Sequence, residues 1–121
     1  LAAADLADER WVSVHAGFPI AGVVTHIAAI AGRPPRIVHR INELSVAAEV
    51  VRASDAIAVM PLVTAQSLAT DGLVLRRLAD VDLVRHVDAL VRPDALESAA
   101  VRRVLDALVA VAETSLRATT A

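Results

Sequence analysis

The stretch 35–61 constrains the fold more than any other part of this chain, because it contains a strand pattern, a helix pattern and a second strand pattern in succession. Residues 37–41 are rich in β-branched side chains, and residues 44–51 place apolar side chains three, four and seven positions apart. Residues 57–60 form a short, continuous apolar run that Pro61 ends. Two strands joined by a crossover helix predict a parallel unit, and parallel units bind ligands where their strands end.

The polar step at the start of the helix in this stretch has two interpretations. Asn42 is a good N-cap residue, and Glu43 would lie in the first turn, where the helix dipole favours an acid. The same two residues follow the end of a strand, so they are also candidates for contact with a ligand. The sequence leaves both interpretations open.

A similar pattern of strand and helix precedes this stretch. Residues 11–15 alternate enough to predict a strand, and residues 20–31 keep helical spacing of apolar side chains. Pro19 suits the first position of that helix, and Gly32 suits its C-terminal stop.

The loop from His15 to Pro19 is the best candidate for a binding site. It joins the C-terminal end of a strand to a helix N-terminus, where backbone N–H groups without partners can hold an anion. Gly17 would let a ligand approach the backbone, and Phe18 would cover the ligand. The alternative is an ordinary turn with Phe18 packed in the core.

The remainder of the chain predicts further helices and strands. Residues 62–70 predict a helix, residues 73–75 and 84–92 predict strands, and residues 96–117 predict a long helix. This order predicts an α/β fold of three layers, with a mainly parallel sheet flanked by helices. The two later strands are predicted to add antiparallel edge strands, and residues 118–121 are predicted to fray.

Composition limits the classes of function. The 121 residues suffice for one domain, and a net charge of −2 gives no reason to expect nucleic acid as a direct partner. The absence of cysteine excludes disulfides and thiolate metal sites. Although 56% of the residues are hydrophobic, no apolar run is long enough to span a bilayer. The chain begins with Leu1 and shows no signal peptide, so we expect a fragment of a longer, cytoplasmic gene product.

Residues that commonly carry chemistry form no catalytic or metal-binding pattern. The four histidines are scattered without a paired spacing, so we predict no metal and no cofactor. No serine lies in a Gly-x-Ser-x-Gly turn, and the four glycines form no phosphate-binding pattern. We therefore predict no catalytic residue and no enzymatic activity.

Short motifs occur in a fixed order along residues 11–115. Residues 11–14 open a strand before a Gly-containing loop, residues 31–35 form an Ala-Gly-x-x-Pro link, and residues 71–74 read Asp-Gly-Leu-Val. Together they resemble the effector-binding domain of LysR-type transcriptional regulators, mainly its second subdomain. Residues 54–56 depart from the pattern, because the family prefers glycines and an apolar residue there. The matching positions within the central stretch are Leu44, Val51, Ala53, Ile57, Ala58 and Pro61.

This resemblance implies half of a periplasmic-binding-protein type II-like fold. It assigns residues 1–10 to a linker or short leading helix and residues 11–92 to the second effector-binding lobe. Residues 93–117 become the C-terminal helix, and residues 118–121 become a frayed tail. The implied function is the sensing of a small-molecule effector for a bacterial transcriptional regulator.

The resemblance also implies partners. Members of the family line the effector pocket from loops at the positions of Met60 and Pro61, and a first lobe supplies the other wall. DNA would be bound only through an N-terminal winged helix-turn-helix that this chain lacks, and no membrane is involved. The last helix returns to the first lobe in this family, so we expect its apolar face to be either core or the interface of a homodimer. This face comprises Val101, Val104, Leu105 and Leu108.

Two other classes stay open at this point. One is a lobe of a two-lobed solute-binding protein, which a signal peptide upstream would favour. The other is a small doubly wound α/β enzyme, which a co-purifying cofactor would favour.

Overall fold

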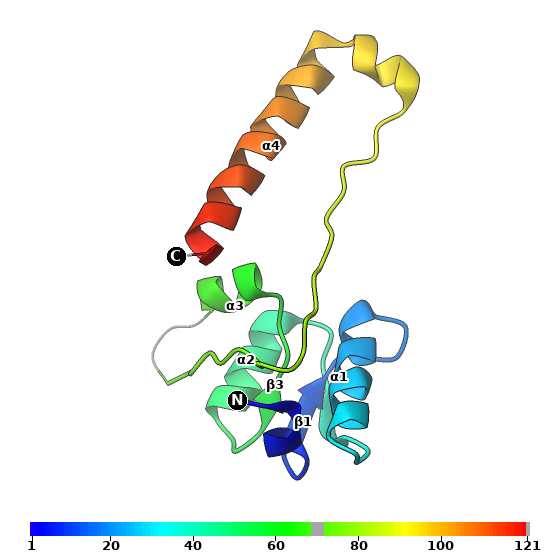
Figure 1. Cartoon of the computed structure of the whole chain (residues 1–121). Helices are drawn as coiled ribbons and strands as arrows, with labels where there is room; N and C mark the ends of the chain where they lie inside the picture. Colours follow the sequence, from blue (N-terminus) through cyan, green and yellow to red (C-terminus); the bar gives the residue numbers. More distant parts are fainter. Residues whose placement is uncertain (69–71, 121) are drawn as a thin grey trace. The chain divides into compact units, whose positions relative to one another are not determined.

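The computed structural model describes residues 1–68 and 72–120, with side chains described as far as residue 114. Figure 1 labels most of the helices and strands. The strands are β1 (Arg10–Ser13), β2 (Arg36–Arg40) and β3 (Ile57–Ala58). The helices are α1 (Pro19–Ile30), α2 (Leu44–Arg52), α3 (Leu62–Leu68) and α4 (Ala99–Thr120), with 3₁₀-helices η1 (Ala3–Leu6) and η2 (Pro93–Glu97).

The three strands form one parallel sheet in the order β2-β1-β3. Trp11 in the central strand lies opposite Ile37 of β2 and opposite Ile57 of β3. The register between β1 and β2 slips after Trp11, so that Val12 lies opposite His39. The chain therefore runs from the central strand to one edge through α1 and crosses to the other edge through α2.

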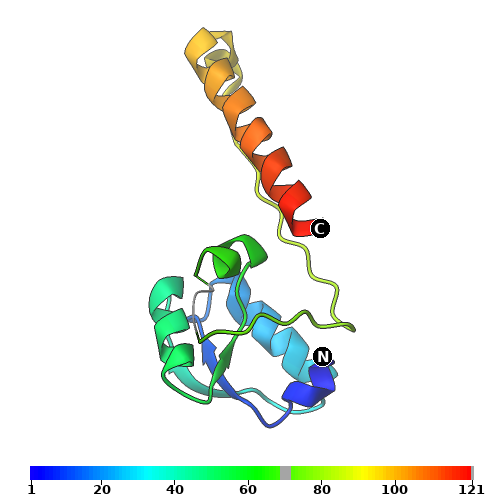
Figure 2. The same cartoon turned by 90° about the vertical axis from the view of Figure 1, so that its left-hand side faces the viewer.

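Helices cover both faces of this sheet. Successive residues of β1 point to opposite faces, so neighbouring side chains pack against different helices. Trp11 packs with Val24 and Ile27 of α1, whereas Val12 packs with Ala47 of α2. Figure 2 shows α1 and α2 on opposite sides of the strands. The prediction of a three-layer α/β fold with a parallel sheet is confirmed.

The bounds of α1 follow from its terminal residues. Pro19 occupies the first helical position, where its missing N–H is not needed. Gly32 has a φ of 74°, a left-handed conformation that suits glycine just after a helix end. Both helix signals were predicted from the sequence, and both are confirmed.

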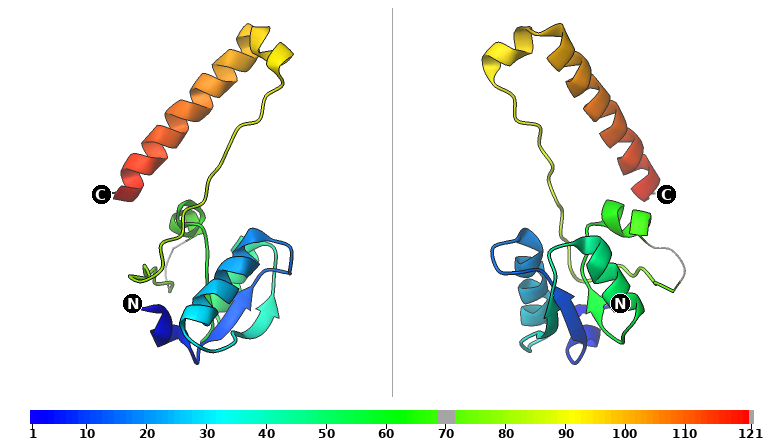
Figure 3. Two further views of the ribbon diagram at one scale, coloured as in Figure 1. Left: turned by 45° about the vertical axis from the view of Figure 1, so that its right-hand side comes forward. Right: turned by 180° about the vertical axis from the view of Figure 1, so that it is seen from behind.

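The predicted antiparallel edge strands are wrong. Residues 73–75 and 84–92 contain no strand in the structure, and Figure 3 draws residues 85–92 as an extended ribbon without an arrow. A β-rich pattern forms a strand only where another backbone pairs with it, and neither segment pairs with one among the described residues. The last helix begins at Ala99 instead of residue 96, because residues 93–97 form η2. It extends to Thr120, and residue 121 lies outside the described residues.

Contacts divide the chain into a first unit, Leu1–Val84, and a second unit, Arg85–Ala121. The first unit holds the buried side chains, including Trp11 at 2% exposure. No side chain described in residues 85–114 is buried. Among the described residues, no helix is both long enough and apolar enough to cross a membrane.

Candidate functional site

The three parallel strands end at one edge of the sheet, and the segments that follow them emerge there. We call these segments, residues 14–18, 41–43 and 59–61, the strand-end edge. The seven residues predicted as an effector site lie on them. These are His15, Gly17 and Phe18 after β1, Asn42 and Glu43 after β2, and Met60 and Pro61 after β3.

A hydrogen bond joins the first two segments of this edge. The backbone N–H of His15 donates to Oδ1 of Asn42 over 2.9 Å. The next backbone link lies one step inside the sheet, where the N–H of Ile41 donates to the carbonyl of Ser13 over 2.8 Å. The loop after β1 is therefore held against the start of α2, although 27 residues separate the two partners in sequence.

The N-cap of α2 is Glu43, so the prediction of Asn42 as N-cap is wrong by one residue. The Glu43 carboxylate accepts hydrogen bonds from the backbone N–H and the hydroxyl of Ser45. Asn42 is not used as a cap because its side-chain oxygen already accepts from His15. The two polar residues thus act on different segments, one across the edge and one within its own helix.

Phe18 lies on the surface of the strand-end edge and not in the core. Its side chain is 49% exposed, which excludes the packed-turn alternative. Its backbone N–H donates to the carbonyl of His15, and its own carbonyl accepts from Ala21 in the first turn of α1. Gly17 has a φ of 97°, a conformation that side chains disfavour, and the position of its missing Cβ is open space.

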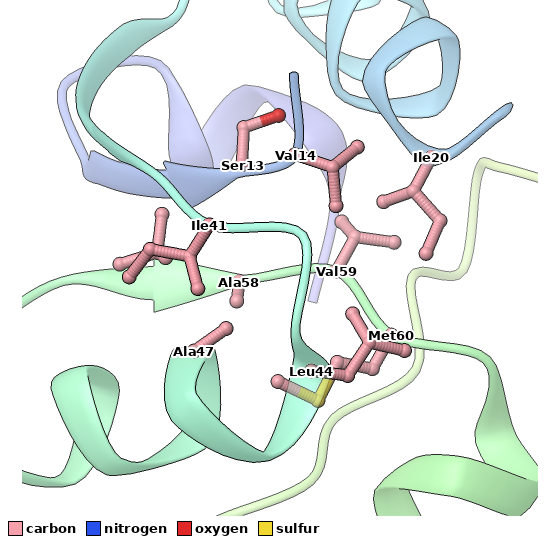
Figure 4. Close-up of a pocket in the computed structure, with 10 residues that line it drawn as sticks. Ser13, Val14, Ile20, Ile41, Leu44, Ala47, Ala58, Val59 and Met60 are labelled. Atoms are coloured by element: carbon pink, nitrogen blue, oxygen red, sulfur yellow. The ribbon is translucent and has the colours of Figure 1, made fainter. Parts of the chain in front are cut away.

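A small cavity lies under this edge, with walls from β1, α1, α2 and the segment after β3 (Figure 4). Its volume for the centre of a water-sized sphere is about 10 Å³, which is enough for one water molecule. Met60 of the predicted site lines it, whereas the other predicted site residues do not. The remaining lining residues are Val12, Ser13, Val14, Ile20, Ile41, Leu44, Ala47, Ala58 and Val59.

Polar groups of the backbone and cationic side chains set the chemistry of this edge. The guanidinium of Arg40 donates to the carbonyl of Val14 over 3.4 Å, which brings a cation to the end of β1. The acid at this edge, Glu43, is already hydrogen-bonded to Ser45. Such an arrangement can bind and orient a small polar ligand.

Sequence reasoning missed the apolar and hydroxyl lining of the cavity. Val14 and Ile41 were read as strand residues, and Ile20 as the apolar face of a helix. Ser13 was read as a strand residue that lies in no nucleophile turn. Alternation along β1 was the usable signal, because it places Ser13 on the buried α1 face at the strand end.

The described residues contain no cluster of three histidine or acidic side chains arranged to hold a metal ion. Of the four histidines, His15 alone lies on the strand-end edge.

The predicted interface residues lie on one face of α4. Val101 and Leu105 are partly buried, whereas Val104 and Leu108 are 60% and 53% exposed. These residues form one wall of an open apolar groove of about 380 Å³, and residues 89–91 form the other wall. The face is therefore covered only in part within the second unit.

The fold is that of an α/β lobe in which three parallel strands end at one edge. A family model described as the LysR substrate binding domain matches residues 1–113. The chain belongs to this family, and the resemblance found from its motifs is confirmed. It is a family of transcriptional regulators and not of enzymes. The comparisons with curated proteins and with solved structures return no match.

Proposed function

We propose that this chain is the effector-sensing lobe of a cytoplasmic LysR-type transcriptional regulator. The observation that carries the proposal is the family match over residues 1–113, together with the convergence of three strand ends at one edge. The effector would lie against the loop that the His15–Asn42 hydrogen bond positions. The proposed contact residues are His15, Gly17, Phe18, Asn42, Glu43, Met60 and Pro61.

The proposed signal is a shift in populations between open and closed arrangements of two lobes. A ligand shifts such an equilibrium only by its difference in affinity for the two states. The cavity of about 10 Å³ supports this mechanism, because a small molecule cannot be enclosed by this edge alone. We therefore expect weak binding by the lobe, with tight binding only when a second lobe closes over the effector.

DNA binding would belong to a separate winged helix-turn-helix segment. The net charge of −2 supports this division, because phosphate recognition relies on basic surfaces. We expect no measurable affinity of this chain for DNA at physiological salt. A sequence-dependent retarded band in a gel-shift assay would contradict the proposal.

The effector site is tested with substitutions in the complete regulator and a transcription reporter. His15→Ala and Phe18→Ala are expected to abolish the response to the effector while DNA binding is retained. His26→Ala is the matched control, since it removes an exposed imidazole from α1, away from the edge. An unchanged response in the first two variants would overturn the site assignment.

We also propose that the apolar face of α4 forms a homodimer interface. The groove between α4 and residues 89–91 supports this, because exposed apolar patches mark association sites. Leu105→Asp should shift sedimentation equilibrium towards the monomer. Val63→Asp, at a position that is 60% exposed in the first unit, should leave the mass unchanged. A monomeric wild-type chain across the whole concentration range would refute this interface.

A further inference from the structure

Hydrogen bonds join the two ends of the first unit to each other. The backbone N–H of Ala79 donates to the carbonyl of Leu1 over 2.8 Å. The backbone N–H of Ala3 donates to both carboxylate oxygens of Asp80, over 2.9 Å and 3.1 Å, although 77 positions separate these partners in sequence. We call this set of bonds the entry–exit clamp. It holds residues 1–3, which open the first unit, against residues 79–80, which lie shortly before the unit ends at Val84.

Apolar packing lies directly beneath the entry–exit clamp. Ala3 belongs to the buried cluster that contains Trp11, and Leu6 packs against this cluster. Leu78 and Val81 pack against the same cluster from the other side of the clamp. The segment 78–81 therefore directs its apolar side chains to the core, while Asp80 between them reaches the start of the chain.

Asp80 supplies the acceptor that the Ala3 N–H needs. Ala3 is the first residue of η1 and is 0% exposed. The N–H groups in the first turn of a helix have no partner within the helix, and burial keeps water from this one. A carboxylate is a stronger acceptor than a neutral oxygen. Asp82, two positions further on, has an exposed side chain that makes no hydrogen bond with the described part of the chain.

The clamp also marks the place where the chain leaves the first unit. Residues 82–90 are all exposed and contain neither helix nor strand. Among the described residues, the bonds of Ala79 and Asp80 are the last hydrogen bonds that hold the chain to the first unit. Loss of these bonds would move the point of exit back towards Gly72.

We propose that Asp80 is a positioning residue that ties the exit of the effector-sensing lobe to its entry, so that both connections turn as one body when the lobes open and close. This inference rests on the proposed effector-sensing function and adds a residue that regulates it from outside the strand-end edge. A hinge works through a few residues at the ends of elements that absorb the change in backbone angles. The clamp confines that change to residues beyond Val81.

The first experiment uses the chain itself and compares Asp80→Ala with Asp82→Ala. Amide hydrogen exchange of Ala3 and Ala79 is followed by NMR. Asp80→Ala should speed both amides about tenfold, which corresponds to the loss of a hydrogen bond to a charged group. Asp82→Ala, the matched control, should leave both unchanged.

The Ala79 amide is the decisive one, because Asp80 does not bond to it. Faster exchange at Ala79 shows that the bonds of the clamp hold as a set, whereas a change confined to Ala3 would overturn the proposal. Amides of β1 should keep their protection, which shows that the variant is folded. Asp80→Asn keeps one acceptor oxygen, so its effect on both amides should be intermediate.

The second experiment uses the complete regulator without any added ligand. Reporter transcription is normalised to promoter occupancy, so that a loss of folded protein does not alter the ratio. Asp80→Ala should change this basal transcription by about threefold or more, because the balance between open and closed lobes shifts. Asp80→Asn should restore it in part, and Asp82→Ala should not alter it.

The outcomes separate this inference from the proposed function. Faster exchange in Asp80→Ala with unchanged basal transcription would leave Asp80 a purely structural role and overturn the inference, while effector sensing stands. The effector site is judged instead by His15→Ala and Phe18→Ala, and an unchanged response in those two variants would not affect the exchange at Ala79.

Discussion

The two units of this chain share a similar apolar composition but differ in what they bury. In the first unit, Trp11, Val24 and Ile27 are almost fully enclosed between the sheet and α1. In the second unit, Leu90 is 96% exposed and the long helix α4 has no buried side chain in its described part. The first unit therefore has a core of its own, and the second unit has only a surface that a partner would complete.

The comparison shows that an apolar pattern alone does not create a core. Burial needs two layers whose apolar faces meet, and the first unit supplies them because a crossover helix packs on each face of its sheet. In the second unit, one amphipathic helix lies beside an extended segment, and this pair buries none of its described side chains. We expect the stability of the two units to differ accordingly.

The largest expected effect is in amide hydrogen exchange. Amides of β1 and α1 should exchange only through global unfolding, which for domains of this size costs about 5–15 kcal/mol. Amides of α4 should exchange almost as fast as in an isolated helix, because helices in water are marginal without packing. Hydrogen-exchange mass spectrometry at low protein concentration measures the exchange of both sets of amides. Equal protection in the two units would contradict the difference in stability proposed here.

Protection of α4 that rises with protein concentration would sharpen the comparison. Such a rise would show that a second copy covers the helix, as proposed for the homodimer. The protection of β1 should not depend on concentration, so it serves as the internal control.

A large truncation in the core should be costly only in the first unit. Trp11→Ala should lower the free energy of unfolding by about 3–5 kcal/mol, because it leaves a cavity between the sheet and α1. Leu90→Ala should change it by less than about 0.5 kcal/mol, because that side chain is exposed. Urea denaturation followed by far-UV circular dichroism measures the free energy of unfolding of both variants. Equal losses would mean that Leu90 is packed against a partner.

A smaller effect is expected at the strand-end edge. Asn42→Ala removes the acceptor of the His15 N–H and should cost about 0.5–1.5 kcal/mol. Its NMR signature should be a shift of the His15 amide. Glu43→Ala removes the cap of α2 instead, and should shift the amide of Ser45 and leave that of His15 unchanged. A His15 shift in both variants would argue against two separate roles.

The smallest effect is expected at an exposed ion pair in α2. The Arg52 side chain, through its hydrogen bond and then its charge, lowers the pKa of Glu49. Arg52→Ala should raise the pKa of Glu49 towards its ordinary value, as followed by a ¹³C NMR titration of the carboxyl. A carboxyl whose pKa is lowered on folding contributes stability above its unfolded pKa and loses it as the pH falls through the folded pKa. Arg76→Ala is the control. If it changed the pKa of Glu49 as much as Arg52→Ala does, the pairing of Arg52 with Glu49 would be contradicted.

The sequence predicted the first unit better than the second, for a physical reason. The elements from β1 to β3 form one parallel sheet with α1 and α2 packed on it, so the local patterns and the final contacts agree. The segment 84–92 carries a strand pattern, but a strand also needs a partner backbone, which no local pattern specifies. No described residue pairs with this segment, and the strand prediction was therefore wrong.

The strand-end location of the seven candidate residues could be read from the sequence, whereas their role as an effector site stays a prediction. Parallel strands end at a common edge of the sheet, so the strand pattern alone places all seven candidate residues on that edge. The one-residue error at Asn42 arose because its side chain bonds to a residue far away in sequence. The buried Ser13 hydroxyl was missed since its lack of a partner becomes apparent only once α1 is packed on the sheet.

The position of Trp11 gives this protein a built-in optical reporter. It is the single tryptophan of the chain, and there is no tyrosine to add to its emission. The indole lies in the central strand, two residues before Ser13, and is enclosed by the α1 layer. Intrinsic fluorescence therefore reports on the first unit with no label attached. The helix α4 contains no tryptophan or tyrosine, so it contributes no emission of its own to that signal.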